Sequence, residues 1–434
     1  MAKTDTANHS EWGTFKDSLK APIHRWFTYP AGFSYKAVEY SIVAAGLNAG
    51  DTIYDPFMGS GTTNLVAKEL GLNSYGVEAH PFVFPITQCK MNWDVDCDEV
   101  IKALEEMASL IANNHISDDK VCDLLQTEFP ELVVKCFLPQ TLYELYLIRE
   151  YIKKLHVSDD VKLFLKVGLI CTLRKVSIAA PGWPYIAPNK IKITSLSKEG
   201  FGTYADFLKS MIDDLQSKQL LKNDSIHCIF LGDSRDTTGI IPDQSVDHIF
   251  TSPPYLNNFD YADRTRLEMY FMGDAKSWND ICQVVRTKLM TSATTQINRS
   301  DKRYRFTDDF IKDNPSEYAF LLNITQKLSE LRLVKGGKKS YDLLAIWYFN
   351  DIYRVLKDNF RILKNNTTAR YILGDSAPYG VHIPTDELIG RIGCNVGFSR
   401  YTIDVLRTRG DKWKDNPQRH NVKLRETIVT LYKD

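Results

Sequence analysis

A short polar and aromatic segment near the middle of the chain has the residue types needed to hold an amine-bearing ring. The sequence Thr-Ser-Pro-Pro-Tyr at residues 251–255 follows an apolar run, residues 246–250, that is typical of a buried strand. Neither a helix nor strand pairing can continue through the two prolines, because proline lacks an amide donor and fixes its own φ. The Ser252 hydroxyl and the Pro253 carbonyl can accept from an exocyclic amine, and Tyr255 can stack on the ring. The alternative interpretation is an ordinary turn after a strand.

A glycine-containing segment nearer the N-terminus indicates a nucleotide-like ligand. Residues 51–63 have the pattern of a short strand, a turn that contains Gly59 and Gly61, and the start of a helix. The glycines let the main chain approach a ligand, and the helix start offers free amides. The next strand ends in Glu78, about 20 residues after Asp55, the spacing at which an acid meets a ribose in nucleotide-binding α/β units. A dinucleotide fingerprint is excluded because the last glycine of G-x-G-x-x-G is missing.

Together the two segments resemble the motifs of the DNA amino-methyltransferases, which use S-adenosylmethionine to methylate cytosine N4 or adenine N6. The D-P-F-M-G-S-G-T run at residues 55–62 is similar to that family's cofactor motif, and T-S-P-P-Y is similar to its catalytic motif. The Leu-Gly-Asp-Ser run at 231–234 resembles the segment whose acid lies near the cofactor adenine. Residues 24–33 resemble the segment that lines the methionine end. The resemblance covers residues 24–85 and 225–434.

The resemblance implies S-adenosylmethionine as cofactor and assigns roles to individual residues. Asp55 is expected to bind the amino group of the cofactor, Glu78 its ribose hydroxyls, and Asp233 its adenine edge. No metal is needed, because the positively charged sulfonium drives the transfer. The residues expected at the cofactor are Tyr29, Ala31, Phe33, Asp55, Pro56, Phe57, Gly59, Gly61, Thr62, Glu78 and Asp233. Those expected at the catalytic centre are Ser252, Pro253, Pro254 and Tyr255.

The same resemblance implies a substrate. Family members with serine before Pro-Pro-Tyr are mostly cytosine N4 enzymes, whereas those with Asp or Asn mostly act on adenine, so Ser252 favours cytosine. We therefore expect methylation of a flipped-out cytosine at N4 in double-stranded DNA, as part of a restriction-modification or related defence system with a possible separate restriction endonuclease. The alternatives are adenine N6 by the same mechanism, an amine on RNA or on a protein glutamine, and a binding subunit without catalytic activity.

The composition limits these possibilities. The chain has 434 residues, 44% of them hydrophobic, and a formal net charge of +0, so a DNA-binding surface must come from local clustering of basic residues. None of its eight cysteines forms a C-x-x-C pair or follows a proline, which predicts reduced thiols and excludes Pro-Cys chemistry on a ring carbon. The start of the chain has no signal-peptide pattern and no apolar run reaches membrane length, which predicts a soluble cytoplasmic protein.

Strands that alternate with helices predict an α/β fold, and the resemblance makes it a Rossmann-like methyltransferase fold with a mostly parallel seven-stranded sheet and helices on both faces. We expect a cofactor-binding half at 1–85, a helical insertion at 86–224, and a catalytic half at 225–434 with a DNA-contact excursion at 274–340. Helices are predicted at 34–46, 64–70, 98–113, 139–155, 158–179 and 341–363. Strands are predicted at 226–230, 246–250, 369–373 and 426–432.

Two basic segments are candidates for DNA contact. Residues 286–306 contain six basic residues and one acid, with Tyr304 and Phe306 between them, which favours phosphate binding over a merely solvated face. A second basic loop lies at 407–420. The residues expected to contact DNA are Arg299, Lys302, Arg303, Arg305, Arg409 and Lys412.

The insertion has two open interpretations. It lies where some members carry a target-recognition region, and its basic and aromatic residues are compatible with DNA contact. It can equally be a helical scaffold that closes the sheet, with those aromatic residues in its core. The residues concerned are Arg174, Lys175, Trp183, Tyr185, Lys190 and Lys192.

Overall fold

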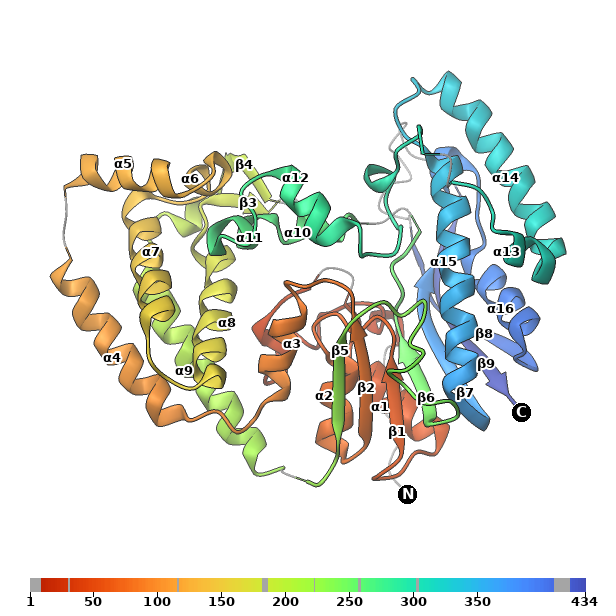
Figure 1. The fold of residues 1–434 in the computed structure, drawn as a ribbon, viewed down its shortest axis with the longest axis horizontal. Helices are drawn as coiled ribbons and strands as arrows, with labels where there is room; N and C mark the ends of the chain where they lie inside the picture. Colours follow the sequence, from red (N-terminus) through yellow and green to blue (C-terminus); the bar gives the residue numbers. More distant parts are fainter. Residues whose placement is uncertain are drawn as a thin grey trace.

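A seven-stranded sheet lies at the centre of the computed structural model of the protein (Figure 1). The residues that the structure describes are 9–29, 32–114, 117–181, 186–221, 223–256, 259–301, 304–409 and 422–434. The strand order is β5-β2-β1-β6-β7-β9-β8. The strands are β1 (Thr52–Asp55), β2 (Asn73–Glu78), β5 (His227–Leu231), β6 (Val246–Thr251), β7 (Leu363–Gly374), β8 (Arg400–Arg409) and β9 (Leu424–Lys433).

The strand directions define one edge of the sheet, called here the functional edge, at which the carboxyl ends of the parallel strands meet. The first five strands in this order pair in parallel, and β9 runs antiparallel to both of its neighbours, β7 and β8. The carboxyl ends of the parallel strands therefore meet at one edge, where open α/β sheets bind their ligands. This arrangement is the predicted Rossmann-like methyltransferase fold, with a reversed strand late in the chain, and it confirms the predicted fold class.

Alternate residues of the central strands pack on opposite faces of the sheet, as the two-residue repeat of a strand requires. Ile53 and Phe250 share a core with α1 and α2, whereas their neighbours Tyr54 and Ile249 share a core with α15 and α16. The sheet is thus covered by helices on both faces (Figure 1). These helices are α1 (Tyr35–Ala45), α2 (Thr62–Leu70), α15 (Tyr341–Ile362) and α16 (Thr385–Val396).

The chain between β2 and β5 is mostly helical and has its own buried core, which Trp26 of the N-terminal segment joins edge-on to Phe164 at 5.6 Å between ring centroids. In Figure 1 these helices lie together on one side of the sheet. They are α3 (Phe84–Met91), α4 (Cys97–Asn113), α5 (Asp118–Glu128), α6 (Glu131–Lys135), α7 (Pro139–Lys154), α8 (Asp159–Val176) and α9 (Gly200–Gln219). A hairpin of β3 (Ala179–Pro181) and β4 (Ile186–Ile191) accompanies them.

Several predicted boundaries differ from the structure for local reasons. The helix predicted from residue 98 begins at Cys97, because the Asp96 side chain caps it by accepting from the amides of Asp98 and Glu99. The helix predicted to reach residue 179 ends at Val176, because Ala179 already pairs in the hairpin. The strand predicted at 369–373 is longer, Leu363–Gly374, since it pairs with β6 and β9 on its two sides.

After β6 the chain makes an excursion and returns to the sheet through α15. Its first helices contact the insertion, and its last pack beside α15 (Figure 1). They are α10 (Tyr261–Arg264), α11 (Arg266–Met272), α12 (Trp278–Ile281), α13 (Asp308–Asp313) and α14 (Pro315–Val334). Among the described residues, no helix is both long and apolar enough to cross a membrane.

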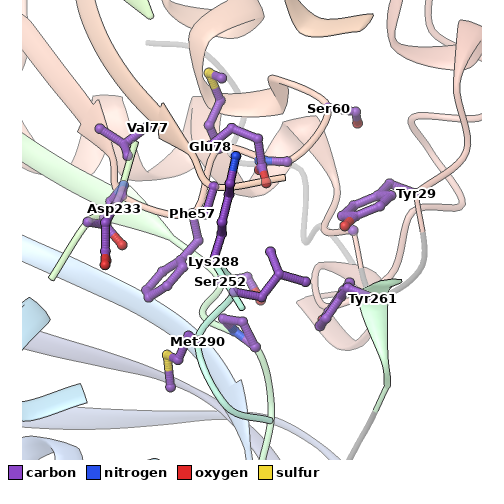
Figure 2. Close-up of a pocket in the computed structure, with 18 of the residues that line it drawn as sticks. Tyr29, Phe57, Ser60, Val77, Glu78, Asp233, Ser252, Tyr261, Lys288 and Met290 are labelled. Carbon is purple, nitrogen blue, oxygen red and sulfur yellow. The ribbon is translucent and has the colours of Figure 1, made fainter. Parts of the chain in front are cut away.

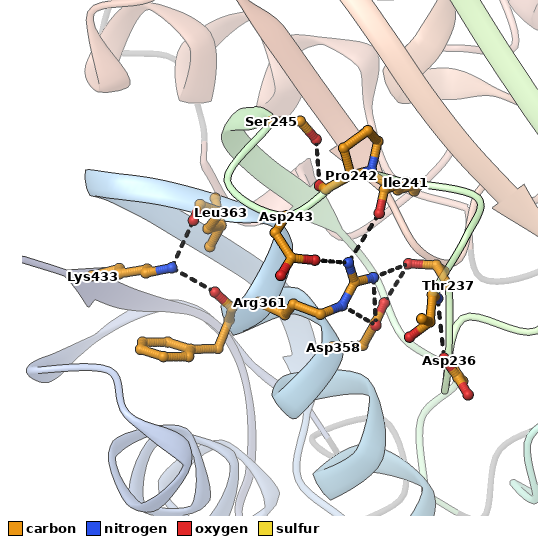
Figure 3. Close-up of polar contacts among 12 residues, drawn as sticks. Asp236, Thr237, Ile241, Pro242, Asp243, Ser245, Asp358, Arg361, Leu363 and Lys433 are labelled. Atoms are coloured by element: carbon orange, nitrogen blue, oxygen red, sulfur yellow. Dashed lines mark hydrogen bonds and ion pairs between the residues drawn. The ribbon is translucent and has the colours of Figure 1, made fainter.

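The connection between β5 and β6 is fixed by one arginine of α15 (Figure 3). The Arg361 guanidinium donates to the carboxylates of Asp358 and Asp243, to the Thr237 hydroxyl and to the Ile241 carbonyl. This connection begins with the Leu-Gly-Asp-Ser run at 231–234, so the contacts of Arg361 hold a segment that leads to the functional edge.

Candidate active site

A pocket at the carboxyl ends of β1, β2 and β6 collects most of the predicted site (Figure 2). Its cavity volume is about 100 Å³. The predicted residues that line it are Tyr29, Phe33, Pro56, Phe57, Gly59, Thr62, Glu78, Asp233, Ser252 and Pro254. The proposed cofactor segment and the proposed catalytic segment, which are separated by almost 200 residues, therefore share one pocket.

The glycine turn has a backbone that only glycine adopts readily. Gly59 and Gly61 have φ values of 52° and 82°, in the left-handed region that disfavours other residues. A Cβ on Gly61 would lie 2.6 Å from the methyl carbon of Thr87, so α3 packs directly against this position. The Gly59 amide donates to the Glu78 carboxylate at 2.7 Å. The turn and the acid at the next strand tip are thus one hydrogen-bonded unit.

Glu78 is a buried carboxylate at the pocket wall, with only 7% of its surface exposed. Its Oε2 accepts from the Gly59 amide and its Oε1 from the His80 amide, both at 2.7 Å. Burial raises the pKa of Glu78 to about 7, although the two amides act in the opposite direction. A carboxylate can accept further hydrogen bonds at each oxygen, so Glu78 can still receive ligand hydroxyls from the pocket.

Asp55 lies behind the pocket, although we predicted a direct cofactor contact for it. It is 0% exposed and is not among the described residues that line the cavity. Its Oδ1 accepts from the Thr251 hydroxyl at 2.6 Å and the Phe57 amide at 3.0 Å, and its Oδ2 accepts from the Thr63 hydroxyl at 2.8 Å. Burial raises the pKa of Asp55 to about 6, against the effect of these donors. Its partners occupy both oxygens and tie the tip of β1 to the tip of β6.

At one end of the pocket, an arginine forms ion pairs with two acids. Asp233 lines the pocket and pairs with Arg235 at 2.7 Å, and Arg235 also donates to Asp351 of α15 at 3.0 Å. Burial alone would raise the pKa of Asp233, but the hydrogen bonds from Arg235 hold it below its usual value. The second oxygen of Asp351 accepts from the Thr291 amide at 3.2 Å. Asp233 is therefore an ionised acceptor whose position is fixed by two other parts of the chain.

The opposite end of the pocket is aromatic. Tyr29 and Tyr261 both line it, with ring centroids 5.6 Å apart. Arg264 of α10 donates to the Thr28 carbonyl at 3.0 Å, which joins the segment before Tyr29 to the helix of Tyr261. Ala31, which we predicted to be at this end, lies outside the described residues.

The catalytic segment divides between the pocket and the core. Ser252 and Pro254 line the pocket, whereas Pro253 is buried. Tyr255 is also buried, with 7% of its surface exposed, and its hydroxyl donates to Glu426 of β9 at 3.0 Å. In this arrangement Tyr255 does not present an open ring face at the pocket, so its stacking on a base stays a prediction.

Comparison with known proteins agrees with this geometry. The family model for N6/N4 methyltransferases, described as DNA methylase, matches residues 4–88. The chain is 25% identical to the Type II methyltransferase M.BsoBI of Geobacillus stearothermophilus, over 99% of this chain and 89% of the relative. It is 24% identical to the Type II methyltransferase M.AvaI of Nostoc, over 91% of this chain and 83% of the relative. These similarities support the DNA amino-methyltransferase family for this chain.

Comparison with solved structures adds little to this assignment. The rRNA methyltransferase AviRa from Streptomyces viridochromogenes aligns over 96% of this chain and 92% of its own, with 8% sequence identity and a TM-score of 0.31. That likeness is too weak to indicate a substrate.

The similarity to this family implies a cofactor of the S-adenosylmethionine type, and the pocket has features that fit one. The positive φ at Gly59 brings the main chain to the cavity without a side chain in the way. Glu78 and Asp233 lie at separate places on the wall, as acceptors for a ribose and for an amino-bearing ring require. Tyr29 and Tyr261 offer aromatic surface to the remaining part.

The first basic segment of the chain, residues 286–306, is only partly available to a polyanion. Arg299 makes two hydrogen bonds of 2.9 Å to the Asp342 carboxylate, and Phe306 is buried in the core beside α15. Arg305 is exposed. The other predicted DNA contacts, Lys302, Arg303 and Lys412, lie outside the described residues, as does the side chain of Arg409.

The candidate residues of the insertion also differ in their surroundings. Arg174 is not free to face DNA, because it pairs with the buried Glu268 of α11 and donates to the Arg264 carbonyl at 2.5 Å. The Lys175 ammonium lies over the ring of Phe207, 4.0 Å from its centroid. Lys190 is exposed on the hairpin and Lys192, just after it, is half-buried, whereas Trp183 and Tyr185 lie outside the described residues.

Sequence reasoning missed several pocket residues that come from distant segments. Arg235 was not selected, although it follows the Leu-Gly-Asp-Ser run by one position. Lys288 and Met290 enter the pocket from the segment that we predicted to face DNA (Figure 2). Arg286 of the same segment pairs with the buried Asp260, next to Tyr261. Two cations of that basic run therefore act at or beside the cofactor pocket.

Proposed function

We propose that this protein is a DNA amino-methyltransferase that transfers a methyl group from S-adenosylmethionine to the N4 amine of a flipped-out cytosine in double-stranded DNA. The observation that carries the proposal is that Ser252 of the catalytic segment lines the same pocket as Gly59 and Glu78 of the cofactor segment (Figure 2). Positioning two reactants in one enclosed site converts a bimolecular reaction into an effectively unimolecular one.

The proposed cofactor contacts follow the pocket from end to end. Glu78 accepts from the ribose hydroxyls and keeps its hydrogen bonds from the backbone amides of Gly59 and His80. Asp233 accepts from the adenine edge, and Arg235 holds Asp233 in place. Tyr29 and Tyr261 enclose the methionine end. When bound, S-adenosylmethionine supplies a methyl group on a positively charged sulfonium.

The role of the protein's own residues in the reaction is to make the target amine nucleophilic and to orient it. An exocyclic amine on an aromatic ring shares its lone pair with that ring and is a poor nucleophile. The Ser252 hydroxyl and the Pro253 carbonyl accept from its two N–H groups, which favours a pyramidal nitrogen with its lone pair directed at the methyl group. The new N–C bond forms as the S–C bond breaks, and the nitrogen releases one proton. Positioning supplies most of the rate enhancement.

Cytosine is proposed over adenine because of Ser252. The family resemblance associates serine at this position with cytosine N4, and a neutral hydroxyl that accepts from an amine brings no charge to the base. Methylation of adenine at N6 by the same residues is the second candidate. The family model that matches residues 4–88 is described as DNA methylase, which favours DNA over RNA as the polymer.

The chain organisation is part of the proposal. We assign cofactor binding to residues 1–85 and catalysis to 225–434, with DNA contact in the excursion at 274–340. Residues 86–224 are the candidate target-recognition region, in which Lys190 is exposed and Lys192 is half-buried. A separate restriction endonuclease is the proposed functional partner, as for other modification enzymes of restriction systems.

The polymer is tested by transfer of a labelled methyl group. Double-stranded DNA, single-stranded DNA and transfer RNA should be incubated with the protein and labelled S-adenosylmethionine, and the label in each polymer measured. We expect label in double-stranded DNA that saturates at a fixed number of sites per molecule. Label in RNA alone would overturn the DNA proposal in favour of an RNA methyltransferase.

Neutralising Arg299, Lys302, Arg303 and Arg305 together should weaken DNA binding and flatten its salt dependence, by about one unit of slope for each phosphate that the variant no longer binds. Arg299→Ala alone should change the slope least, because Arg299 already pairs with Asp342. Binding is measured by fluorescence anisotropy over a salt series. Neutralising the exposed Lys16, Lys20 and Lys36 is the control, and an equal change of slope per neutralised residue in the two sets would assign residues 286–306 to a solvated face.

A further inference from the structure

Buried carboxylates contact both residues that flank the catalytic turn, Ser252-Pro253-Pro254. On the N-terminal side, the Thr251 hydroxyl donates to Asp55 at 2.6 Å. On the C-terminal side, the Tyr255 hydroxyl donates to Glu426 at 3.0 Å. Asp55 is 0% exposed and Glu426 is 2% exposed. The turn that carries the proposed acceptors is thus held at its two ends by acids of two other strands.

Each acid is itself fixed in place. Asp55 also accepts from the Thr63 hydroxyl and the Phe57 amide, so it cannot rotate without breaking these bonds. Glu426 accepts from Arg407 of β8 at 2.5 Å through its second oxygen. Hydrogen bonds to a charged group are stronger than those between neutral groups, which makes these carboxylates firm anchors.

The positions of the acids in the sheet explain why they reach the turn. Asp55 ends β1, which pairs directly with β6, the strand that leads into the turn. Glu426 lies on β9 opposite Gly374, the last residue of β7. Strands on both sides of β6 thus reach its carboxyl end, so one carboxylate approaches the turn from each side.

We propose that Asp55 and Glu426 are positioning residues of the catalytic turn, acting through Thr251 and Tyr255. This inference rests on the proposed role of Ser252 and Pro253 as acceptors of the target amine. Two prolines stiffen the turn internally, but they do not fix its orientation relative to the sheet. The two hydroxyl contacts fix that orientation and so set the direction from which the acceptors meet the amine. Reaction rates are sensitive to this direction, because a misplacement of about 1 Å can cost about 100-fold.

The proposal gives Asp55 a function other than the predicted contact with the cofactor amino group. A residue that bound the cofactor would need an oxygen directed into the pocket, whereas Asp55 is 0% exposed and does not line the pocket, and both of its oxygens accept from protein donors. Removing the Thr251 hydroxyl should therefore slow methyl transfer and leave cofactor affinity unchanged.

Two single-hydroxyl deletions test the proposal with little change of shape. Thr251→Val removes the donor to Asp55, and Tyr255→Phe removes the donor to Glu426 while keeping the ring. The matched controls delete buried hydroxyls elsewhere: Thr172→Val in α8, whose hydroxyl donates to Gly168, and Tyr371→Phe in β7, whose hydroxyl accepts from Asn359. The measurements are the single-turnover rate of methyl transfer to DNA, the Kd of the cofactor, and the midpoint of urea unfolding.

We expect Thr251→Val and Tyr255→Phe each to lower the single-turnover rate about tenfold, with cofactor Kd within about twofold of wild type. The two controls should keep the wild-type rate even where they lower the unfolding midpoint by a similar amount. Glu426→Gln added to Tyr255→Phe should slow the reaction little further, because the acid acts through the hydroxyl that is already absent.

Three results would overturn the proposal. The first is a wild-type rate in both deletion variants. The second is an equal loss of rate in the controls, which would show that the contacts of Thr251 and Tyr255 only stabilise the fold. The third is a multiplicative effect of Glu426→Gln and Tyr255→Phe, which would show that the two residues act separately. A wild-type protein that transfers no methyl group to DNA would instead contradict the proposed function, together with the inference that rests on it.

Discussion

Ser252→Ala is expected to lower the rate of methyl transfer about 100-fold and to leave cofactor affinity within about twofold of wild type. The substitution removes one of two acceptors for the target amine, so the nitrogen is no longer held with its lone pair directed at the methyl group. Ser252 lines the pocket, but the turn of Gly59 and the acid Glu78 remain intact. Single-turnover kinetics and calorimetry of cofactor binding measure the two quantities separately.

The matched control for this prediction is Ser245→Ala. Ser245 lies just before β6 and donates to the Pro242 carbonyl at 2.7 Å, at the opposite end of the strand from the catalytic turn (Figure 3). We expect the rate of methyl transfer by Ser245→Ala to equal that of the wild type. If Ser252→Ala kept full activity, the Pro253 carbonyl alone would have to orient the nitrogen, and the role assigned to the serine would be wrong.

Glu78→Gln should weaken cofactor binding by about 1.5–3 kcal/mol, or about 10- to 150-fold. The glutamine side chain lacks the negative charge that strengthens hydrogen bonds from the ribose hydroxyls. Its NH2 group would also face the amide of either Gly59 or His80, since the carboxylate accepts from both. Cofactor Kd is measured by calorimetry at pH 8. An unaltered Kd would remove Glu78 from the cofactor site.

The same residue predicts a pH dependence of cofactor binding. Burial raises the pKa of Glu78 to about 7, so the carboxylate is mostly protonated below that pH. Ribose hydroxyls donate to the ionised form, and affinity should therefore rise with pH through 7 and level off above it. Below pH 7 the loss should approach about tenfold for each pH unit.

Two variants separate this effect from other titrations. Glu78→Gln should abolish the pH dependence between pH 6 and 8, because the group that titrates is absent. Glu39→Gln is the control, since burial raises the pKa of Glu39 on α1 as well, away from the pocket. A wild-type affinity that stays constant over this range would contradict the assigned ionisation.

The local motifs of this chain could be found from the sequence because their physics is local. A left-handed turn needs glycine, so Gly59 and Gly61 were recognisable from residue type and spacing. Two adjacent prolines after a β-type run fix the place where β6 ends. The alternation of strands and helices gave the Rossmann-like sheet, and the resemblance supplied its reversed strand.

The contacts of those motifs could not be found in the same way, because they join residues far apart in sequence. Tyr255 and Glu426 meet only when β9 inserts between β7 and β8. Asp55 belongs to the family's cofactor motif, and nothing near it in sequence indicates that Thr251 will occupy one of its oxygens. A motif therefore indicates candidate residues but not which of them face the pocket.

Charge patterning was the least informative signal. The basic run at 286–306 suggested a phosphate-binding surface, yet Arg286 and Arg299 are paired with the acids Asp260 and Asp342. Lys288 lines the cofactor pocket instead. A sequence shows how many cations a segment carries, but their acidic partners come from other parts of the fold and decide which cations remain available.

The nature of the methylated base tests the central claim most directly. Double-stranded DNA should be incubated with the purified protein and S-adenosylmethionine, digested to nucleosides, and analysed by mass spectrometry, with the Ser252→Ala variant as a parallel sample. The account predicts N4-methylcytosine with the wild-type protein and about 100-fold less in the same time with the variant. N6-methyladenine would contradict the choice of base, and the absence of any methylated nucleoside would contradict the proposed function itself.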